Sequence, residues 1–409
     1  MLPVVLVSYD IGAASPVKIA AAARRVCDVV FLADRARPHV ADQYENLLQV
    51  GRVVDITGLT RADIIAAVSE MNPAGVVSFS EFQQSLVSDL VEALGLRGNS
   101  PATVHLLTDK LRQRQCLADA GVQSTCSAAI TSLQEIEAAA LRVGFPAVLK
   151  PRRGSGSVHT YLVNSLEECA IRVREVSGTG VVDFVLEELL VGDTSGPGAG
   201  WGDYVSVESV VQNGEAQTVC VTGKHPLAEP FRETGDILPS TLEDSLAAEV
   251  VSLERAALTA LGVQDGVYHT EVKLTAEGPR IIEVNGRMAG YVGDLLMRAA
   301  GLDLTRVALE VALGKPVSVN DVTFDRFTYQ RFVIPPAGSH TVVSLDPLQT
   351  LSEISGVQRV EVRTQVGEKL DWRDGTQGML AIVYGSASCP EEVLAFISAA
   401  EIAAAESCM

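Results

Sequence analysis

Short, mostly apolar runs alternate with amphipathic stretches along the first hundred residues. The runs have the length of buried strands, and segments with helical periodicity follow them. The runs are residues 4–7, 29–32, 53–56 and 76–79, and the helical segments are residues 14–25, 42–48, 62–71 and 82–94. Strands that alternate with helices form βαβ units, so residues 1–98 predict an α/β domain with a parallel sheet.

The pattern changes after residue 98. Ser100 before Pro101 predicts a helix start, because serine caps the first turn and proline fits into it. Further predicted strands are residues 145–151, 159–163, 184–190 and 203–211, and predicted helices are residues 109–120, 241–261 and 294–313, with others starting at 133 and 166. Residues 192–202, rich in Gly, Ser and Pro, predict a mobile loop insertion. We expect units at 99–185 and 186–320, and then a β-rich lobe at 321–409 that ends in a helix over 390–405.

Composition restricts the class of protein. The chain has 409 residues with 32 basic against 51 acidic side chains, a net charge of −19, which argues against a nucleic acid or an anionic membrane as partner. The apolar start has no basic segment before it, so it predicts a strand rather than a secretory signal. Its 7 cysteines form no CxxC pair, which predicts reduced thiols and a cytoplasmic location.

The most informative segment is residues 269–287, where two strand-like runs flank a turn. If the turn has three residues centred on Glu277, Glu271 lies directly opposite Glu283 and Asn285 lies opposite His269. Two carboxylates that face each other across a sheet repel, and a divalent cation would offset this repulsion.

Oxygen ligands of this kind select Mg²⁺ or Mn²⁺, so Glu271, Glu283 and Asn285 are the candidate metal ligands. Arg287 at the strand end adds a fork for phosphate or carboxylate. The alternative is a solvated face on which Lys273 or Arg280 neutralises Glu271.

A second candidate site follows the strand at 145–151. Lys150 ends this strand, and the loop that follows contains Gly154, Ser155, Gly156 and Ser157. Glycines let backbone amides approach an anion, so the loop is a candidate phosphate site, although a plain turn fits equally well. Lys110 near a helix start is a second phosphate candidate. The sequence contains neither a GxGxxG dinucleotide fingerprint in its first unit nor a GK[ST] motif in this loop.

In this order, these motifs resemble the ATP-grasp superfamily of carboxylate–amine ligases, including bacterial L-amino-acid ligases. The motifs are Asp109-Lys110, Lys150 with the glycine loop, Glu187-Glu188-Leu189, and Glu271 followed by Glu283-Val284-Asn285-Gly286-Arg287. The resemblance implies an ATP-grasp fold with an N-terminal parallel-sheet domain, two central nucleotide-clamping subdomains and a C-terminal β-rich lobe.

The resemblance also implies a role for each candidate residue. Lys110, Lys150 and the loop residues Gly154, Ser155, Gly156 and Ser157 would bind ATP phosphates, and Glu187, Glu188, Leu190 and Asp203 would hold adenine and ribose. Glu271, Glu283 and Asn285 would bind two Mg²⁺ ions, and Arg287 would stabilise an acyl phosphate or hold a substrate carboxylate. Glu233 and Gly235 match a substrate-handling segment, where Glu233 would hold a substrate ammonium, but Asp236 stands where the family usually has histidine.

The activity implied is ATP-dependent formation of an amide between a small-molecule carboxylate, such as an amino acid, and an amine. ADP and phosphate would be released after an acyl-phosphate intermediate. Two alternatives stay open: another ATP-grasp ligase such as a bicarbonate-activating carboxylase component, and a catalytically silent nucleotide-binding regulator. A homodimer is compatible with this class, although no segment is diagnostic of an interface.

Overall fold

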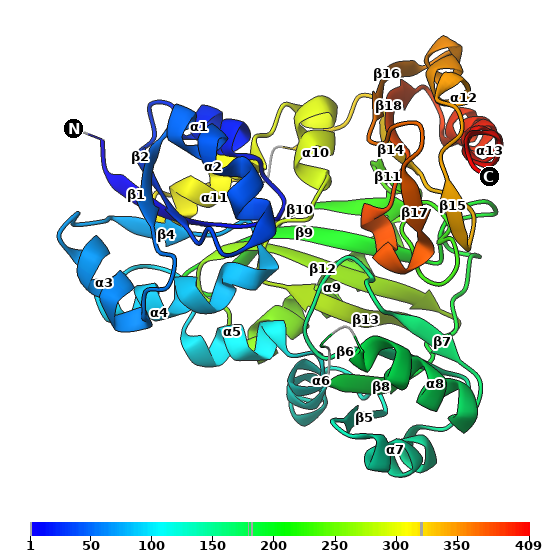
Figure 1. Ribbon diagram of the computed structural model, residues 1–409, viewed down its shortest axis with the longest axis horizontal. Coiled ribbons are helices and arrows are strands. Elements are labelled where there is room, and N and C mark those ends of the chain that lie inside the picture. Colours follow the sequence, from blue (N-terminus) through cyan, green and yellow to red (C-terminus); the bar gives the residue numbers. More distant parts are fainter. Residues whose placement is uncertain (1, 179, 181–182, 320–321) are drawn as a thin grey trace.

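The computed structural model describes residues 2–178, 180, 183–319 and 322–409 (Figure 1). The predicted boundary between residues 320 and 321 lies outside these residues. The chain forms three sheets of four or more strands. These are a four-stranded N-terminal sheet, a second four-stranded sheet and an eight-stranded sheet.

The N-terminal sheet is parallel, as predicted. Its strand order is β3-β2-β1-β4, with β1 (Val4–Tyr9), β2 (Asp28–Ala33), β3 (Arg52–Asp55) and β4 (Gly75–Val77). The helices are α1 (Pro16–Ala23), α2 (Pro38–Val50), α3 (Arg61–Ser69) and α4 (Gln84–Leu94), the last preceded by the 3₁₀ turn η1 (Glu81–Gln83). Both faces are apolar, because separate buried clusters lie on the two sides of β1 and β2.

The second four-stranded sheet is antiparallel and has the order β5-β8-β6-β7. Its elements are β5 (Ser127–Ile130), β6 (Ala147–Pro151), β7 (Tyr161–Val163) and β8 (Phe184–Glu188), with the 3₁₀ turn η2 (Leu133–Glu135), α7 (Ile136–Val143) and α8 (Leu166–Ser177). Two helices lead into it, α5 (Pro101–Thr108) and α6 (Lys110–Asp119). The helix predicted over 109–120 begins at Lys110, because Thr108 ends α5 and Asp109 caps α6 by accepting from Arg112 N.

The eight-stranded sheet has the order β13-β12-β9-β10-β11-β14-β18-β16. Its strands are β9 (Tyr204–Gln212), β10 (Glu215–Lys224), β11 (Gly235–Leu238), β12 (Gly266–Thr275), β13 (Gly278–Asn285), β14 (Phe327–Val333), β16 (Val357–Val362) and β18 (Ala381–Ala387). Strands β10 and β11 were absent from the prediction. Because β11 pairs with β14, the C-terminal strands extend the same sheet as the predicted metal hairpin.

Five further helices pack around this sheet: α9 (Asp244–Leu261), α10 (Val292–Ala300), α11 (Leu304–Ala312), α12 (Asp346–Thr350) and α13 (Pro390–Ser407). The helix predicted over 294–313 is two helices, because Gly301 ends α10 with φ +69° and Asp303 caps α11. A small two-stranded sheet, β15 (Ser339–Thr341) with β17 (Lys369–Asp371), leads into the 3₁₀ segment η4 (Trp372–Gln377). Trp201, at the end of the Gly/Ser/Pro-rich insertion, is buried in the C-terminal core.

Candidate active site

The register of the hairpin places the candidate metal ligands opposite one another. Glu271 pairs with Glu283 and His269 pairs with Asn285, as the sequence predicted. The predicted turn was one residue too long, since Thr275 pairs with Gly278 across a two-residue turn. A register shift just after Glu271, where Val272 pairs with Ile281, offsets this difference and brings the carboxylates into line.

Strand β13 is an edge strand of the large sheet, and side chains from outside the sheet form hydrogen bonds with its unpaired backbone N–H and C=O groups. The Gln113 side chain donates to Val284 O at 2.9 Å and accepts from Val284 N at 2.8 Å. The Gln123 side chain makes the same pair of bonds with Ile281, at 3.0 Å and 2.5 Å. These bonds cover the sheet edge and fix α6 against the hairpin, which places Lys110 beside Glu283.

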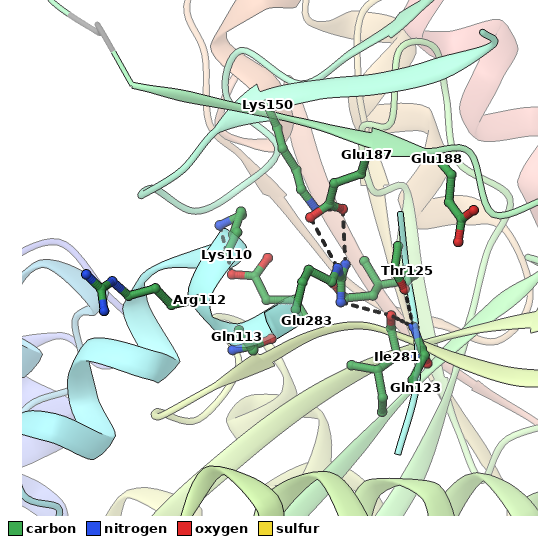
Figure 2. A network of polar contacts seen from close by, with 12 residues as sticks. Lys110, Arg112, Gln113, Gln123, Thr125, Lys150, Glu187, Glu188, Ile281 and Glu283 are labelled. Atoms are coloured by element: carbon green, nitrogen blue, oxygen red, sulfur yellow. Dashed lines mark hydrogen bonds and ion pairs between the residues drawn. The ribbon is translucent and has the colours of Figure 1, made fainter. Parts of the chain in front are cut away.

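Three cations and two carboxylates meet where α6, β6, β8 and β13 converge (Figure 2). Lys110 Nζ lies 2.8 Å from Glu283 Oε1 and donates to Gly154 O at 2.9 Å. Lys150 Nζ lies 2.8 Å from Glu187 Oε2. We call Lys110, Arg114, Lys150, Glu187 and Glu283 the cationic cluster, because its formal charges are three positive and two negative.

Arg114 is the member of this cluster that the sequence analysis missed. Its Nε and Nη2 lie 3.1 Å from the two Glu187 oxygens, and its Nη1 donates to Ile281 O at 3.1 Å. Although burial raises the pKa of Glu187, Arg114 and Lys150 lower it to about 2. Glu187 therefore stays ionised and holds Lys150, so its carboxylate is not free to meet a ribose.

Burial has the opposite effect on the lysines. It lowers the pKa of Lys150, and Glu187 offsets only part of this. Burial also acts on Lys110, but there Glu283 outweighs it and the pKa of Lys110 is raised. A phosphate oxygen would favour the charged form of both groups, because it would add negative charge to a buried site.

The loop after β6 contains several residues with positive φ. Gly154 and Gly156 have φ values of +142° and +70°, and Ser157 and His159 are also left-handed, at +57° and +56°. The start of the loop is tied to α6, because Arg152 Nη2 lies 2.5 Å from Asp109 Oδ2 and Lys110 N donates to Arg152 O. This loop therefore lies directly beside Lys110.

Glu271 belongs to a chain of polar groups that runs across the sheet. His269 Nδ1 lies 2.7 Å from Glu208 Oε1 on β9, and His269 Nε2 lies 3.4 Å from Glu271 Oε1. Burial lowers the pKa of His269, but Glu208 raises it to about 9. Burial likewise raises the pKa of Glu271, but the hydrogen bond from His269 lowers it to about 2. Glu271 is thus an ionised carboxylate in a fixed orientation.

Arg287 is partnered by the N-terminal domain. Its Nε lies 3.3 Å from Glu81 Oε2, and Glu81 follows β4 at the carboxyl end of the parallel sheet. The pKa of Glu81 is raised by burial, and Arg287 offsets only part of this rise. The sequence analysis missed Glu81; its signal was a carboxylate just after a strand end, where ligands bind in open parallel sheets.

A third group of charges lies on β10 and β11. Lys224 Nζ is 2.7 Å from Asp236 Oδ1 and 3.2 Å from Glu233 Oε1, and Gln330 Nε2 donates to Asp236 Oδ2 at 2.7 Å. We call Lys224, Glu233 and Asp236 the anionic cluster, because it has one positive and two negative formal charges. Asp236, which replaces the family histidine, is committed to Lys224 and Gln330.

The remaining candidates lie at the margin of the site. Asp203 Oδ1 forms an ion pair with Lys273 Nζ at 2.7 Å. Glu188 N donates to Cys126 O at 2.9 Å, so this amide is already occupied, and the Glu188 carboxylate lies 3.4 Å from Arg280 Nη2. Leu190 follows the end of β8 and is half-buried.

Two other kinds of site are absent from the described residues. None of their helices is both long and apolar enough to cross a membrane. Within the same ranges, no group of three or more His, Cys, Asp or Glu side chains is placed to hold a metal ion. A metal on the hairpin would therefore depend on two carboxylates, the Asn285 amide and oxygens from outside the protein.

Residues 143–294 match the family model described as an ATP-grasp domain. The chain contains an ATP-grasp domain and has the ATP-grasp fold, so the predicted resemblance and fold class are confirmed. The crystal structure of an L-amino acid ligase from Bacillus licheniformis superimposes with a TM-score of 0.78 at 21% identity, covering 100% of this chain and 98% of that one.

Two curated relatives are similar to this chain over part of their length. Alanine–anticapsin ligase of Bacillus subtilis (strain 168) is 28% identical over 282 residues, which are 65% of this chain and 60% of that protein. Carnosine synthase 1 of Homo sapiens is 30% identical over 250 residues, 56% of this chain and 29% of that protein. The alignments thus span less than two thirds of these relatives.

Proposed function

We propose that this protein is an ATP-dependent carboxylate–amine ligase that joins an amino-acid carboxylate to an amine. The observation that carries the proposal is the pairing of Glu271 with Glu283 beside Lys110 and Lys150. Two facing carboxylates next to two buried lysines suit a triphosphate with bound cations. The similarity to proteins named as alanine–anticapsin ligase and L-amino acid ligase supports this reading.

The chemistry has two steps. An oxygen of the substrate carboxylate attacks the γ-phosphorus of ATP, and the bond from that phosphorus to the β,γ-bridging oxygen breaks to release ADP. The amine, bound as an ammonium, first gives up one proton. Its nitrogen then attacks the acyl carbon, the bond to the phosphate oxygen breaks to release phosphate, and the nitrogen loses a second proton to the released phosphate. Positioning and charge neutralisation are the main contributions of the protein to phosphoryl transfer.

The cationic cluster provides donors for the phosphates. Lysine has three N–H donors, and Lys110 uses one on Gly154 O and one on Glu283, which leaves one for a phosphate oxygen. Lys150 keeps two beyond its contact with Glu187. The amides of Gly154 to Ser157 would cover the phosphates, with adenine near Glu188 and Leu190 and the ribose near Asp203.

The hairpin residues fit Mg²⁺. Glu271 is ionised and oriented by His269, and Glu283 and Asn285 add oxygens on the same face. We propose that these three residues hold two ions, with Mn²⁺ as a substitute. Bound there, the cations would neutralise phosphate charge and polarise the γ-phosphate.

The anionic cluster suits the other substrate. Glu233 is the exposed member, with 29% of its side chain accessible, so it is the group that can meet a substrate ammonium. Asp236 acts through Lys224 and does not contact the substrate. Arg287, held by Glu81, would bind the carboxylate that becomes the acyl phosphate.

A screen of ADP release over pairs of amino acids, with the product mass measured, tests the proposal. We expect one family of pairs to trigger ADP release with an amide product, and Glu283→Ala to abolish both. Glu277→Ala, in the exposed hairpin turn, is the matched control and should retain activity. Absence of an amide from every pair, or ADP release triggered by bicarbonate alone, would overturn the proposal.

A further inference from the structure

The C-terminal lobe reaches across the site and touches the glycine loop. Segment η4 meets residues 156–158 of the loop between β6 and β7, although more than two hundred residues separate them in the sequence. Thr376 N donates to Gly156 O at 3.2 Å. The loop proposed to cover the ATP phosphates is therefore held by η4 at Gly156 as well as by Lys110 at Gly154.

Gly375 makes this contact possible. Its φ of +65° is in the left-handed region, and a Cβ atom there would lie 2.4 Å from Gly156 O and 3.1 Å from Val158 N. Both neighbours are backbone atoms, so no rotamer change can relieve such a clash. A side chain at 375 can be accommodated only if the glycine loop moves away from η4.

Thr376 also contacts the anionic cluster. Its Oγ1 accepts a hydrogen bond from Glu233 N at 3.2 Å, and the residue is 2% exposed. One residue thus bonds with its backbone to the glycine loop and with its side chain to the segment that carries Glu233. Thr376 therefore links the two halves of the site through two hydrogen bonds.

Aromatic packing fixes η4 from its other end. The rings of Trp372 and Tyr161 pack edge to face with centroids 6.0 Å apart, and the Arg172 guanidinium lies 5.1 Å from the Tyr161 centroid and 5.8 Å from that of Trp372. Tyr161 begins β7, directly after the glycine loop. The segment is therefore attached to the loop on both sides of Gly375.

We propose that Gly375 and Thr376 form a clasp in which Thr376 is a positioning residue that couples the glycine loop to Glu233. The chemical role of the clasp rests on the proposed function. Holding the loop over the phosphates keeps water from the acyl phosphate, and holding Glu233 keeps the amine in reach. Loss of the coupling would let ATP be hydrolysed without amide formation.

The first test removes only the Thr376 hydroxyl. Thr376→Val keeps the shape and the backbone bond to Gly156 but gives Glu233 N no acceptor, whereas Thr376→Ser restores one. We expect the amide formed per ADP released to fall about fivefold in Thr376→Val and to stay within about twofold of wild type in Thr376→Ser. An unchanged ratio in a Thr376→Val protein with wild-type thermal unfolding would overturn the role of Thr376.

The second test needs no turnover. Gly375→Ala is compared with Gly367→Ala, a glycine of the same lobe at φ +87° whose added Cβ would meet nothing within 4 Å. Trypsin cleavage after Arg153, identified by fragment mass, reports whether the loop is displaced. We expect cleavage several-fold faster in Gly375→Ala than in Gly367→Ala, with the difference reduced by a non-hydrolysable ATP analogue and Mg²⁺.

The two proposals can fail separately. If the wild-type protein forms no amide from any pair, the proposed ligase function fails while the trypsin comparison still tests the clasp. If Gly375→Ala and Gly367→Ala are cleaved at equal rates, the clasp is overturned whatever the activity of the wild-type protein.

Discussion

The cationic and anionic clusters use the same residue types in opposite proportions. The first has Lys110, Lys150 and Arg114 against two carboxylates, and the second has Lys224 alone against two. In both, lysines are buried and held by carboxylates at 2.7 to 3.2 Å. Under the proposed function, this difference of sign would select the ligand: an excess cation suits a phosphate, and an excess carboxylate suits an ammonium.

The comparison also distinguishes a lysine needed mainly for stability from one needed mainly for activity. Glu187 keeps Arg114 as a partner if Lys150 is removed, because Arg114 contacts both Glu187 oxygens. Asp236 has only Lys224 as a cationic partner within the described part of the chain. The two lysines should therefore respond differently to the same substitution.

Lys224→Met should give the largest loss of stability. It leaves Asp236, which is 4% exposed, buried without a cation, and breaking a buried pair in this way typically costs about 3–5 kcal/mol. Urea denaturation measures the effect. Lys273→Met, which breaks the more exposed pair with Asp203, is the control and should cost about 1 kcal/mol or less.

Adding Asp236→Asn to Lys224→Met removes the uncompensated charge. We expect this double variant to regain a large part of the lost stability, since the amide can still bond with Gln330. A double variant as unstable as Lys224→Met would show that packing rather than charge makes Lys224 important.

Lys150→Met should instead lower activity and leave the fold largely intact. A lysine that clamps a transferring phosphoryl group contributes about 10²–10³-fold to the rate, and Arg114 continues to neutralise Glu187. ADP release and urea denaturation are measured on the same protein, with the exposed Lys369→Met as control. A stability loss as large as that of Lys224→Met would remove the distinction between the clusters.

The sequence was sufficient for the parts of the site that depend on local pattern. The alternation of strands and helices predicted the parallel sheet, and the period of two placed Glu271 opposite Glu283. Even there two small errors cancelled, because the turn is one residue shorter than assumed and the register shift beyond Glu271 offsets it. The position of Lys150 near a strand end, just before a loop with glycines, also followed from local pattern, whereas phosphate binding there stays a prediction.

Contacts between distant segments could not be predicted in this way. Glu81, Arg114 and Thr376 come from three parts of the chain that only the tertiary structure brings to the site. The joining of the C-terminal strands to the central sheet through β11 and β14 is equally non-local. A single sequence shows residue types and spacing, whereas these contacts depend on how whole sheets pack.

Glu254 shows how burial changes the pKa of a carboxylate that has no ion pair among the described residues. It is a fully buried carboxylate on α9. Burial raises the pKa of Glu254 to about 7, and the Ser209 hydroxyl and Arg255 offset only part of this rise. Arg114 and Lys150, which contact Glu187 directly, lower the pKa of Glu187 to about 2 despite its burial. Direct ion pairs thus keep a buried carboxylate ionised.

Because the pKa of Glu254 is higher in the folded state than its ordinary value of 4.5, its stabilising contribution is complete below pH 4.5 and lost as the pH rises through about 7. Glu254→Gln mimics the neutral form. It should therefore raise the free energy of unfolding by up to about 3 kcal/mol at pH 8.5 and change it little at pH 4. The exposed Glu249→Gln on the same helix is the control, and an equal gain at both pH values would contradict the assignment.

Glu233→Gln should produce the smallest effect, and a specific one. The substitution keeps the shape of the side chain and removes the excess negative charge, so the KM for the amine substrate should rise about tenfold, or about 1.4 kcal/mol, while the KM for ATP stays within about twofold. Burial raises the pKa of Glu233 despite Lys224, so the wild-type enzyme should lose amine affinity as the pH falls through that raised value, and the variant should not. Glu229→Gln, an exposed neighbour in the same segment, is the control. A rise in the KM for ATP instead would place the excess carboxylate on the phosphate side and reverse the assignment of the two clusters.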